Sequence, residues 1–175
     1  MAEAILGSPR GFGPLSRAEA GRLLALLLPT ALLGGAFAFQ YIGGLYPCEM
    51  CWWQRYPHAA AIILGALAFT APATSRRSRN LVLLAALAIA ISGLIGVYHA
   101  GVELKIFEGF TTCTSTAKAA STQELLKQLM KVPLIRCDQI QWSLFGISMA
   151  GWNAIFSLGG ASAITWLTLS GRHAK

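Results

Sequence analysis

The sequence predicts an all-α membrane protein: a bundle of four transmembrane helices with a long outer loop that carries a short amphipathic helix. Only 12% of the 175 residues are charged, against about 25% in an ordinary soluble domain. The mean hydropathy is +0.56. Four long apolar segments follow one another, and the chain length suits a single domain, residues 1–175.

The apolar segments cover approximately residues 23–42, 54–71, 81–100 and 144–169. A helix needs about 20 apolar residues to cross a bilayer. Lipid offers the backbone no hydrogen-bond partner, so each segment is expected to be helical. The second segment reaches spanning length only if residues 51–55 are already helical or lie at the interface. Pro57 favours a different start, with the regular helix beginning near Trp53 or Gln54.

The fourth segment contains residues that suit contact with a neighbouring helix. Asn153 is polar in the middle of this segment and is expected to form a hydrogen bond across the bundle. Small residues would let the helix approach a neighbour closely; they are Gly146, Ala150, Gly159 and Ala163.

The first segment has a second interpretation, as a cleaved signal peptide. Arg22 precedes the apolar run, and Ala36-Phe37-Ala38 has the pattern of a cleavage site. The run continues through Ile42, however, which favours a helix that is retained.

Lysine and arginine positions predict the orientation, because short cytoplasmic loops are rich in these residues. The loop at 71–80 and both terminal segments carry such residues and are assigned to the cytoplasm. The outer loops are then approximately residues 43–53 and 101–143, and they contain all four cysteines. The cytoplasmic residues are Arg10, Arg17, Arg22, Arg76, Arg77, Arg79, Arg172 and Lys175.

The net charge of +7 permits binding to nucleic acid or to an anionic membrane surface. Apolar runs separate the charges, so no continuous basic face is visible. We therefore favour the membrane and predict no nucleic-acid partner.

Cys48 and Cys51 form a C-x-x-C pair at the outer end of the second segment. Helical spacing would place positions 48, 51 and 55 near one face. The permanent charge of Arg55 would then favour the thiolate, which is the reactive species in thiol–disulfide exchange. Redox chemistry is one interpretation of the pair, and a structural disulfide is another.

A zinc site built from all four cysteines is a further interpretation of the C-x-x-C pair. It would need a second closely spaced pair. Instead, 23 residues lie between Cys113 and Cys137, a spacing that suits a disulfide pinning a loop. We therefore predict no metal site of this kind.

Two further features lie in or beside the second outer loop. His99 and Glu103, four residues apart, either face a site at the membrane surface or are ordinary interfacial residues. The segment Ser121-Thr122-Gln123-Glu124 has the pattern of a capping box that opens a short amphipathic helix. That helix would lie on the membrane surface or pack on the end of the bundle.

Taken together, these features resemble the disulfide bond formation protein B family, DsbB, over nearly the whole chain. The segment 47–55, PCEMCWWQR, is similar to the family pattern P-C-x-x-C-x-x-x-R. Cys137-Asp138, Phe145-Gly146 and Gly151-Trp152-Asn153 resemble parts of some family members. The second cysteine pair also lies in the expected outer loop.

The resemblance implies a bacterial inner-membrane enzyme that reoxidises a periplasmic, thioredoxin-fold DsbA-like protein and passes the electrons to ubiquinone or menaquinone. Such an enzyme supports disulfide formation during protein folding. By analogy, Cys113 would take the mixed disulfide with the partner, and Cys137 and Cys48 would relay electrons between the loops. Cys51 would lie next to the quinone and Arg55 would support its reactivity. His99 or Glu103 would occupy the position of a family histidine near the quinone.

Two alternatives compete with this function. An enzyme resembling vitamin K epoxide reductase would share the four-helix core, but in that family the loop cysteines precede the C-x-x-C, whereas here the C-x-x-C comes first. A non-enzymatic membrane protein would use two disulfides only to fix its outer loops. Structural disulfides resist reduction, whereas catalytic pairs exchange readily.

Overall fold

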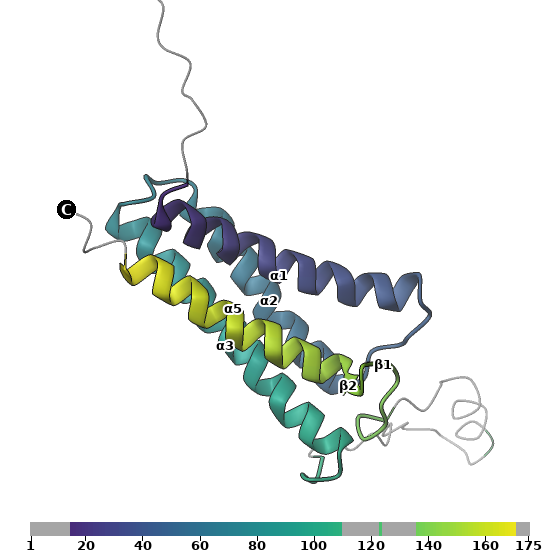
Figure 1. Ribbon diagram of the computed structural model, residues 1–175. Helices are drawn as coiled ribbons and strands as arrows, with labels where there is room; N and C mark the ends of the chain where they lie inside the picture. Colours follow the sequence, from purple (N-terminus) through teal and green to yellow (C-terminus); the bar gives the residue numbers. More distant parts are fainter. Residues whose placement is uncertain (1–14, 110–122, 124–135, 171–175) are drawn as a thin grey trace, which may run out of the picture.

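The computed structural model describes residues 15–109, 123 and 136–170. This part of the chain forms four α-helices and one short hairpin (Figure 1). The helices are α1 (Arg17–Tyr41), α2 (Glu49–Ala68), α3 (Arg76–Glu103) and α5 (Met149–Ser170), and the strands are β1 (Ser143–Leu144) and β2 (Ile147–Ser148).

Side chains cap the first three helices and so fix where they begin. Ser16 and Glu19 form a capping box at α1, in which the Glu19 carboxylate accepts from the Ser16 N–H at 3.0 Å. Ser75 caps α3 by accepting from the Ser78 N–H at 3.1 Å. At α2 the cap is Cys48, whose sulfur accepts from the Cys51 N–H at 3.3 Å. One of the candidate redox cysteines is therefore also the N-cap residue at the start of a helix.

The prediction that α2 would begin near Trp53 or Gln54 is wrong, because the helix starts at Glu49 and Pro57 lies inside it. Residues 51–55 are helical, as spanning length requires. A proline leaves a carbonyl one turn earlier without its usual donor. The Ser92 hydroxyl donates to the adjacent Gln54 carbonyl at 2.8 Å. This bond ties α3 to α2 at the turn that Pro57 disturbs, although the carbonyl that Pro57 itself leaves without a donor is that of Trp53.

The fourth apolar segment also differs from its prediction, because its helix begins at Met149 rather than at 144. Residues 143–148 form the antiparallel hairpin, with Ser143 opposite Ser148. Its two turn residues, Phe145 and Gly146, have φ of 52° and 77°. Positive φ at both positions is the geometry of a tight two-residue hairpin turn.

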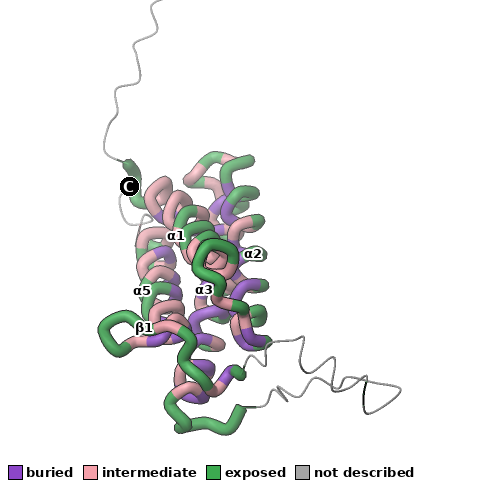
Figure 2. The backbone as a smooth tube through the Cα atoms, turned by 90° about the vertical axis from the view of Figure 1, so that its right-hand side faces the viewer, coloured by how far each residue is buried: buried purple, intermediate pink, exposed green. Residues whose placement is uncertain are grey.

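The core of the bundle is built mainly from small residues. In the described part of the chain, α3 packs between α2 and α5, and α1 packs on the other side of the same two helices. Buried positions lie on the inward sides of the helices (Figure 2). The central cluster consists of Ala25, Ala61, Ala68, Val82, Ala85, Ala86, Ile89, Ala161 and Ile164.

Large apolar side chains point outward instead. Leu27, Ile63, Leu87, Leu94 and Ile155 are each at least half exposed. A soluble protein rarely exposes so many large apolar side chains on its helices. Among the described helices, α1 and α3 are long and apolar enough to cross a membrane.

The two ends of the bundle have different chemistry. At one end, the Arg22 guanidinium donates to Ala71 O at 3.1 Å and stacks on Phe69, while Arg17 lies over the Trp166 ring. The three-arginine start of α3 and the end of α5 lie at this end too (Figure 1). The C-x-x-C pair and the hairpin lie at the other end. The described arginines that the sequence assigns to the cytoplasm thus lie at the opposite end of the bundle from the C-x-x-C pair.

Candidate functional site

Cys48 and Cys51 lie together at the start of α2. Their sulfur atoms are 3.0 Å apart, and both are free thiols rather than a disulfide. Cys48 is 4% exposed and Cys51 is half-buried. The N-cap position of Cys48 turns its side chain back over the first helical turn, which is why the two sulfurs meet.

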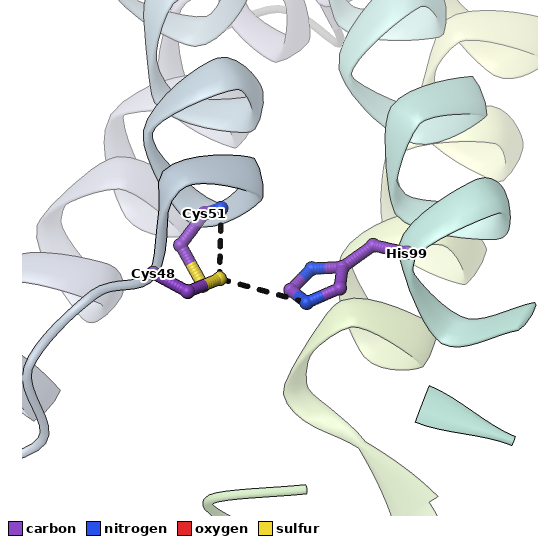
Figure 3. A group of neighbouring side chains, drawn as sticks. All are labelled: Cys48, Cys51 and His99. Atoms are coloured by element: carbon purple, nitrogen blue, oxygen red, sulfur yellow. Dashed lines mark hydrogen bonds between the residues drawn. The ribbon is translucent and has the colours of Figure 1, made fainter. Parts of the chain in front are cut away.

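His99 faces this pair from α3 (Figure 3). Its Nε2 atom lies 3.6 Å from Cys48 Sγ, and its Nδ1 atom lies 2.9 Å from the Gln54 amide nitrogen. Glu103 is one turn further along α3, with Oε1 3.9 Å from His99 Nε2. Both residues line a cavity of about 80 Å³ with Cys48, Cys51 and Gln54. The sequence leaves open whether His99 and Glu103 face a site or are ordinary interfacial residues. In the structure both face the cysteine cavity.

A network of buried polar groups continues from His99 into the bundle. Asn153 Nδ2 donates to Gln54 Oε1 at 2.8 Å, and Asn153 Oδ1 lies 2.9 Å from His58 Nε2. Ser92 Oγ also lies 2.9 Å from His58 Nε2. The expectation that Asn153 bonds across the bundle is confirmed. The network joins α2, α3 and α5 directly behind the cysteines.

Arg55 lies at the same end of α2, but its guanidinium contacts α1. It donates to Gln40 Oε1 and, at 3.2 Å, to Ala36 O. The guanidinium carbon is 4.9 Å from the Trp52 ring centre and 5.0 Å from that of Phe37. Cys48, by contrast, contacts α3. Arg55 thus bridges α2 to α1 beside the cysteine cavity.

Cys137 is brought to the first cysteine pair, although it is distant in sequence. It is 2% exposed and packs in one buried cluster with Cys48, Met50 and Val102. Hydrogen bonding with Cys137, then with Cys51, together with burial, raises the pKa of Cys48. Cys113 and the predicted amphipathic helix after Ser121 fall outside the described residues, apart from Gln123.

The residue after Cys137 fastens this part of the loop to the bundle. Asp138 accepts from Lys105 Nζ at 2.5 Å and from the Arg136 guanidinium at 2.8 and 2.9 Å. Hydrogen bonds from Arg136 and then Lys105 hold the pKa of Asp138 well below its usual range. The carboxylate therefore stays charged and keeps Cys137 beside α3.

A second, larger cavity of about 290 Å³ lies between α1 and α5. Its walls are mostly apolar and include Leu32, Ala36, Phe39 and Phe156. Three residues line both this cavity and the cysteine cavity: Trp142, Met149 and Asn153. An apolar space thus adjoins the thiols through a shared wall.

Sequence reasoning missed Gln54, His58 and Ser92 as members of the site. A signal for them was present in the spacing. Gln54 and His58 are four residues apart on α2, and Ser92 and His99 are seven apart on α3. Each pair lies on one helix face, and polar pairs in apolar helices usually face the interior.

Comparison with known proteins finds similar sequences in one family. The sequence model of the family "Disulfide bond formation protein DsbB" matches residues 18–167. "Disulfide bond formation protein B 2" of Pseudomonas savastanoi pv. phaseolicola is 33% identical over 143 residues, covering 75% of this chain and 77% of the relative. "Disulfide bond formation protein B" of Marinobacter nauticus is 27% identical over 141 residues, covering 76% and 81%. No solved structure matches this chain significantly.

The described fold and site define a helical bundle of membrane-protein character with a buried dithiol at one end. The chain belongs to the DsbB family of disulfide bond formation proteins.

Proposed function

We propose that this protein is a quinone-dependent thiol–disulfide oxidoreductase that reoxidises a periplasmic DsbA-like dithiol protein. The observation that carries the proposal is the position of the free Cys48–Cys51 thiols. They line a cavity that shares Trp142, Met149 and Asn153 with an apolar cavity between α1 and α5. A protein dithiol and a lipid-soluble acceptor could meet there without exposure to water.

The proposed relay uses the four cysteines in order. The partner's thiolate attacks the Cys113–Cys137 disulfide at Cys113, and the partner leaves oxidised, with two electrons and two protons transferred to the loop pair. The Cys137 thiolate then attacks a Cys48–Cys51 disulfide at Cys48 and releases the Cys51 thiolate. The Cys113 thiolate attacks Cys137 in this mixed disulfide, which reforms the loop disulfide and leaves Cys48 and Cys51 reduced. The packing of Cys137 against Cys48 supports this exchange.

The apolar cavity fits a quinone in its chemistry. Apolar walls suit a hydrocarbon ring and tail, and the Asn153 side chain provides a polar group at the shared wall. When bound, a quinone supplies a two-electron, two-proton acceptor. The chain's own residues deliver those electrons from the Cys48–Cys51 thiols. Arg55 would hold a fixed positive charge beside the site, and His99 lies within reach of Cys48 Sγ.

The proposed topology places all four helices across the bacterial inner membrane, with spans near residues 23–42, 54–71, 81–100 and 144–169 in one domain. Both termini and the arginine-rich end would be cytoplasmic. The C-x-x-C pair and the 101–143 loop would be periplasmic. The exposed apolar side chains support this arrangement, as does the separation of the arginines near the starts of α1 and α3 from the C-x-x-C pair.

Turnover by the purified protein in lipid nanodiscs tests the function. The protein is mixed with ubiquinone and a reduced DsbA-like protein, and quinone absorbance is followed. We expect partner-dependent quinone loss in the native protein and none in Cys51→Ser, because the last thiol in the relay is missing. Ser162→Ala, an exposed position on α5, serves as the matched control and should turn over normally.

Three results would contradict the proposal. Normal turnover by Cys51→Ser would remove Cys51 from the relay. Cysteines inert to both quinone and partner would favour a protein whose disulfides only fix loops. Epoxide reduction by the native protein would instead favour the vitamin K epoxide reductase-like alternative.

A further inference from the structure

Four side chains with metal-binding atoms converge on the cysteine cavity. The two thiol sulfurs and an imidazole nitrogen, from Cys48, Cys51 and His99, all lie within 4.8 Å of one another. Glu103 lines the same cavity, and its side chain is 6% exposed. Its Oε2 atom is buried and within 3.5 Å of no donor among the described residues, although the Ser148 side chain interacts with the same carboxyl. A carboxylate oxygen left unpaired in a buried site is costly unless a cation or donor satisfies it.

The distances suit tetrahedral zinc. With Zn–S bonds of about 2.3 Å and Zn–N bonds of about 2.1 Å, a tetrahedral ion separates sulfur from nitrogen by about 3.6 Å. Cys48 Sγ and His99 Nε2 are 3.6 Å apart. Two thiolates on one zinc ion lie about 3.8 Å apart, so the sulfurs, now 3.0 Å apart, must separate slightly. Side-chain rotation of the half-buried Cys51 provides that movement.

We propose that the reduced Cys48–Cys51 pair, with His99 and Glu103, forms a binding site for a single Zn²⁺ ion. Both thiols lose their protons when the ion binds, so the site supplies two thiolates, one neutral imidazole and one carboxylate. Thiolate and imidazole ligands select zinc over magnesium or calcium, which prefer oxygen. This site differs from the four-cysteine site that the sequence argues against, because it uses neither Cys113 nor Cys137.

The surroundings can accommodate the ion. Arg136 is the cation lining this cavity, and its guanidinium is paired with Asp138. Zinc on His99 Nε2 leaves the ring proton on Nδ1, where the Gln54 amide lies 2.9 Å away. The Gln54 amide must turn so that its oxygen accepts this proton, and Asn153 turns with it. Such a hydrogen bond behind a metal-binding histidine orients the ring.

Zinc at this position would hold both sulfurs as ligands and prevent them from forming a disulfide. The consequence rests on the proposed function: bound zinc would stop the relay while the dithiol is reduced. Binding itself does not depend on that function. The site would therefore inhibit turnover whenever zinc reaches the reduced enzyme.

The test measures Zn²⁺ binding to the purified, reduced full-length protein in nanodiscs without quinone or partner. Competition with a chromophoric chelator gives stoichiometry and affinity. We expect one Zn²⁺ per chain, with no binding after Cys48→Ser, Cys51→Ser or His99→Ala. Glu103→Gln should bind more weakly, and Glu108→Gln, an exposed acid nearby, should bind normally. Co²⁺ in place of zinc should give thiolate-to-cobalt charge-transfer absorption.

A second measurement needs no substitution and so does not depend on how a variant folds. The native protein oxidised with diamide should bind no zinc at this site, because a disulfide sulfur is not a thiolate ligand.

Two further variants test whether the loop cysteines take part. Cys113→Ser and Cys137→Ser should both still bind zinc. Equal zinc binding by the oxidised and reduced protein would overturn the assignment. So would a Cys137→Ser variant that loses zinc while Glu103→Gln binds it as tightly as the native protein does.

Parallel turnover assays separate this inference from the proposed function. Zinc binding without turnover would support the zinc site and contradict the proposed oxidoreductase function. Normal turnover with no zinc binding would do the reverse. If both hold, added Zn²⁺ should inhibit native turnover, and the chelator should restore it.

Discussion

Asn153 connects three helices through a single side chain. It contacts Gln54 on α2, His58 one turn further on, and Ser92 on α3. These partners are buried, so water cannot replace a lost bond. Because Gln54 in turn contacts His99, the position of the histidine opposite Cys48 depends on a residue on α5.

Replacing Asn153 with alanine should therefore destabilise the bundle. We expect a loss of about 1–3 kcal/mol in the free energy of unfolding, because buried partners lose their hydrogen bonds. Unfolding in mixed detergent micelles measures it. Ser162→Ala removes an exposed hydroxyl that bonds only within α5 and should change stability by less than about 0.5 kcal/mol. Equal stability of the two variants would show that the network is energetically neutral.

Some residues of the site are predictable from sequence and others are not. The C-x-x-C spacing is enough to place Cys48 and Cys51 together, because three residues cover less than one helical turn. The sequence is enough to place His99 and Glu103 at the end of α3. It does not show whether the face of α3 that carries them points into the bundle. That Arg55 contacts α1 and that Cys137 reaches Cys48 depend on contacts between segments far apart in the chain.

At the scale of elements, glycines on α3 set how closely that helix meets α5. A Cβ atom at Gly96 would lie 3.0 Å from Ala150 O, and one at Gly93 would lie 3.0 Å from Ser157 Cβ. Close backbone approach through small residues is typical of membrane helix pairs. Ala150 was among the small residues predicted to serve this contact. Gly159 was predicted for the same role wrongly, because a Cβ there meets nothing within 4 Å.

Valine substitutions at Gly96 and Gly159 should destabilise the bundle by clearly different amounts. Gly96→Val should cost about 1–3 kcal/mol of stability, because the added methyl groups force α3 away from the α5 backbone. Gly159→Val, matched in chemistry but facing open space, should cost well under half as much. Thermal unfolding in detergent compares them. A larger loss for Gly159→Val would contradict the packing of α3 on α5.

Over the whole molecule, the arginines near the starts of α1 and α3 lie at one end of the bundle and the C-x-x-C pair lies at the other. This arrangement follows from four helices that alternate in direction, so that each connection falls at one end or the other. Positive charge favours the cytoplasmic side.

Cysteine labelling tests which end faces which side. In a variant with all four native cysteines replaced by serine, Glu108→Cys and Thr74→Cys each add one thiol at an exposed position. An impermeant maleimide should label position 108 in intact spheroplasts and position 74 only after permeabilisation. Thr74 is chosen because the arginines beside it remain. Labelling of position 74 in intact spheroplasts, with position 108 protected, would show that the topology is the reverse of the one proposed. It would also contradict the proposed periplasmic relay.

Hydropathy and short-range spacing are local properties. The amino-acid sequence is therefore enough to identify the apolar segments, the placement of charge and the two thiols at the start of one helix. The rotation of each helix about its axis was decided only by the tertiary structure. Apolar residues surround these helices on nearly every side, so periodicity alone does not tell the inward face from the outward one. Close packing at glycine and alanine, and buried bonds such as Asn153 to Gln54, fix that rotation. They thereby bring His99, Glu103 and Cys137 to the thiols.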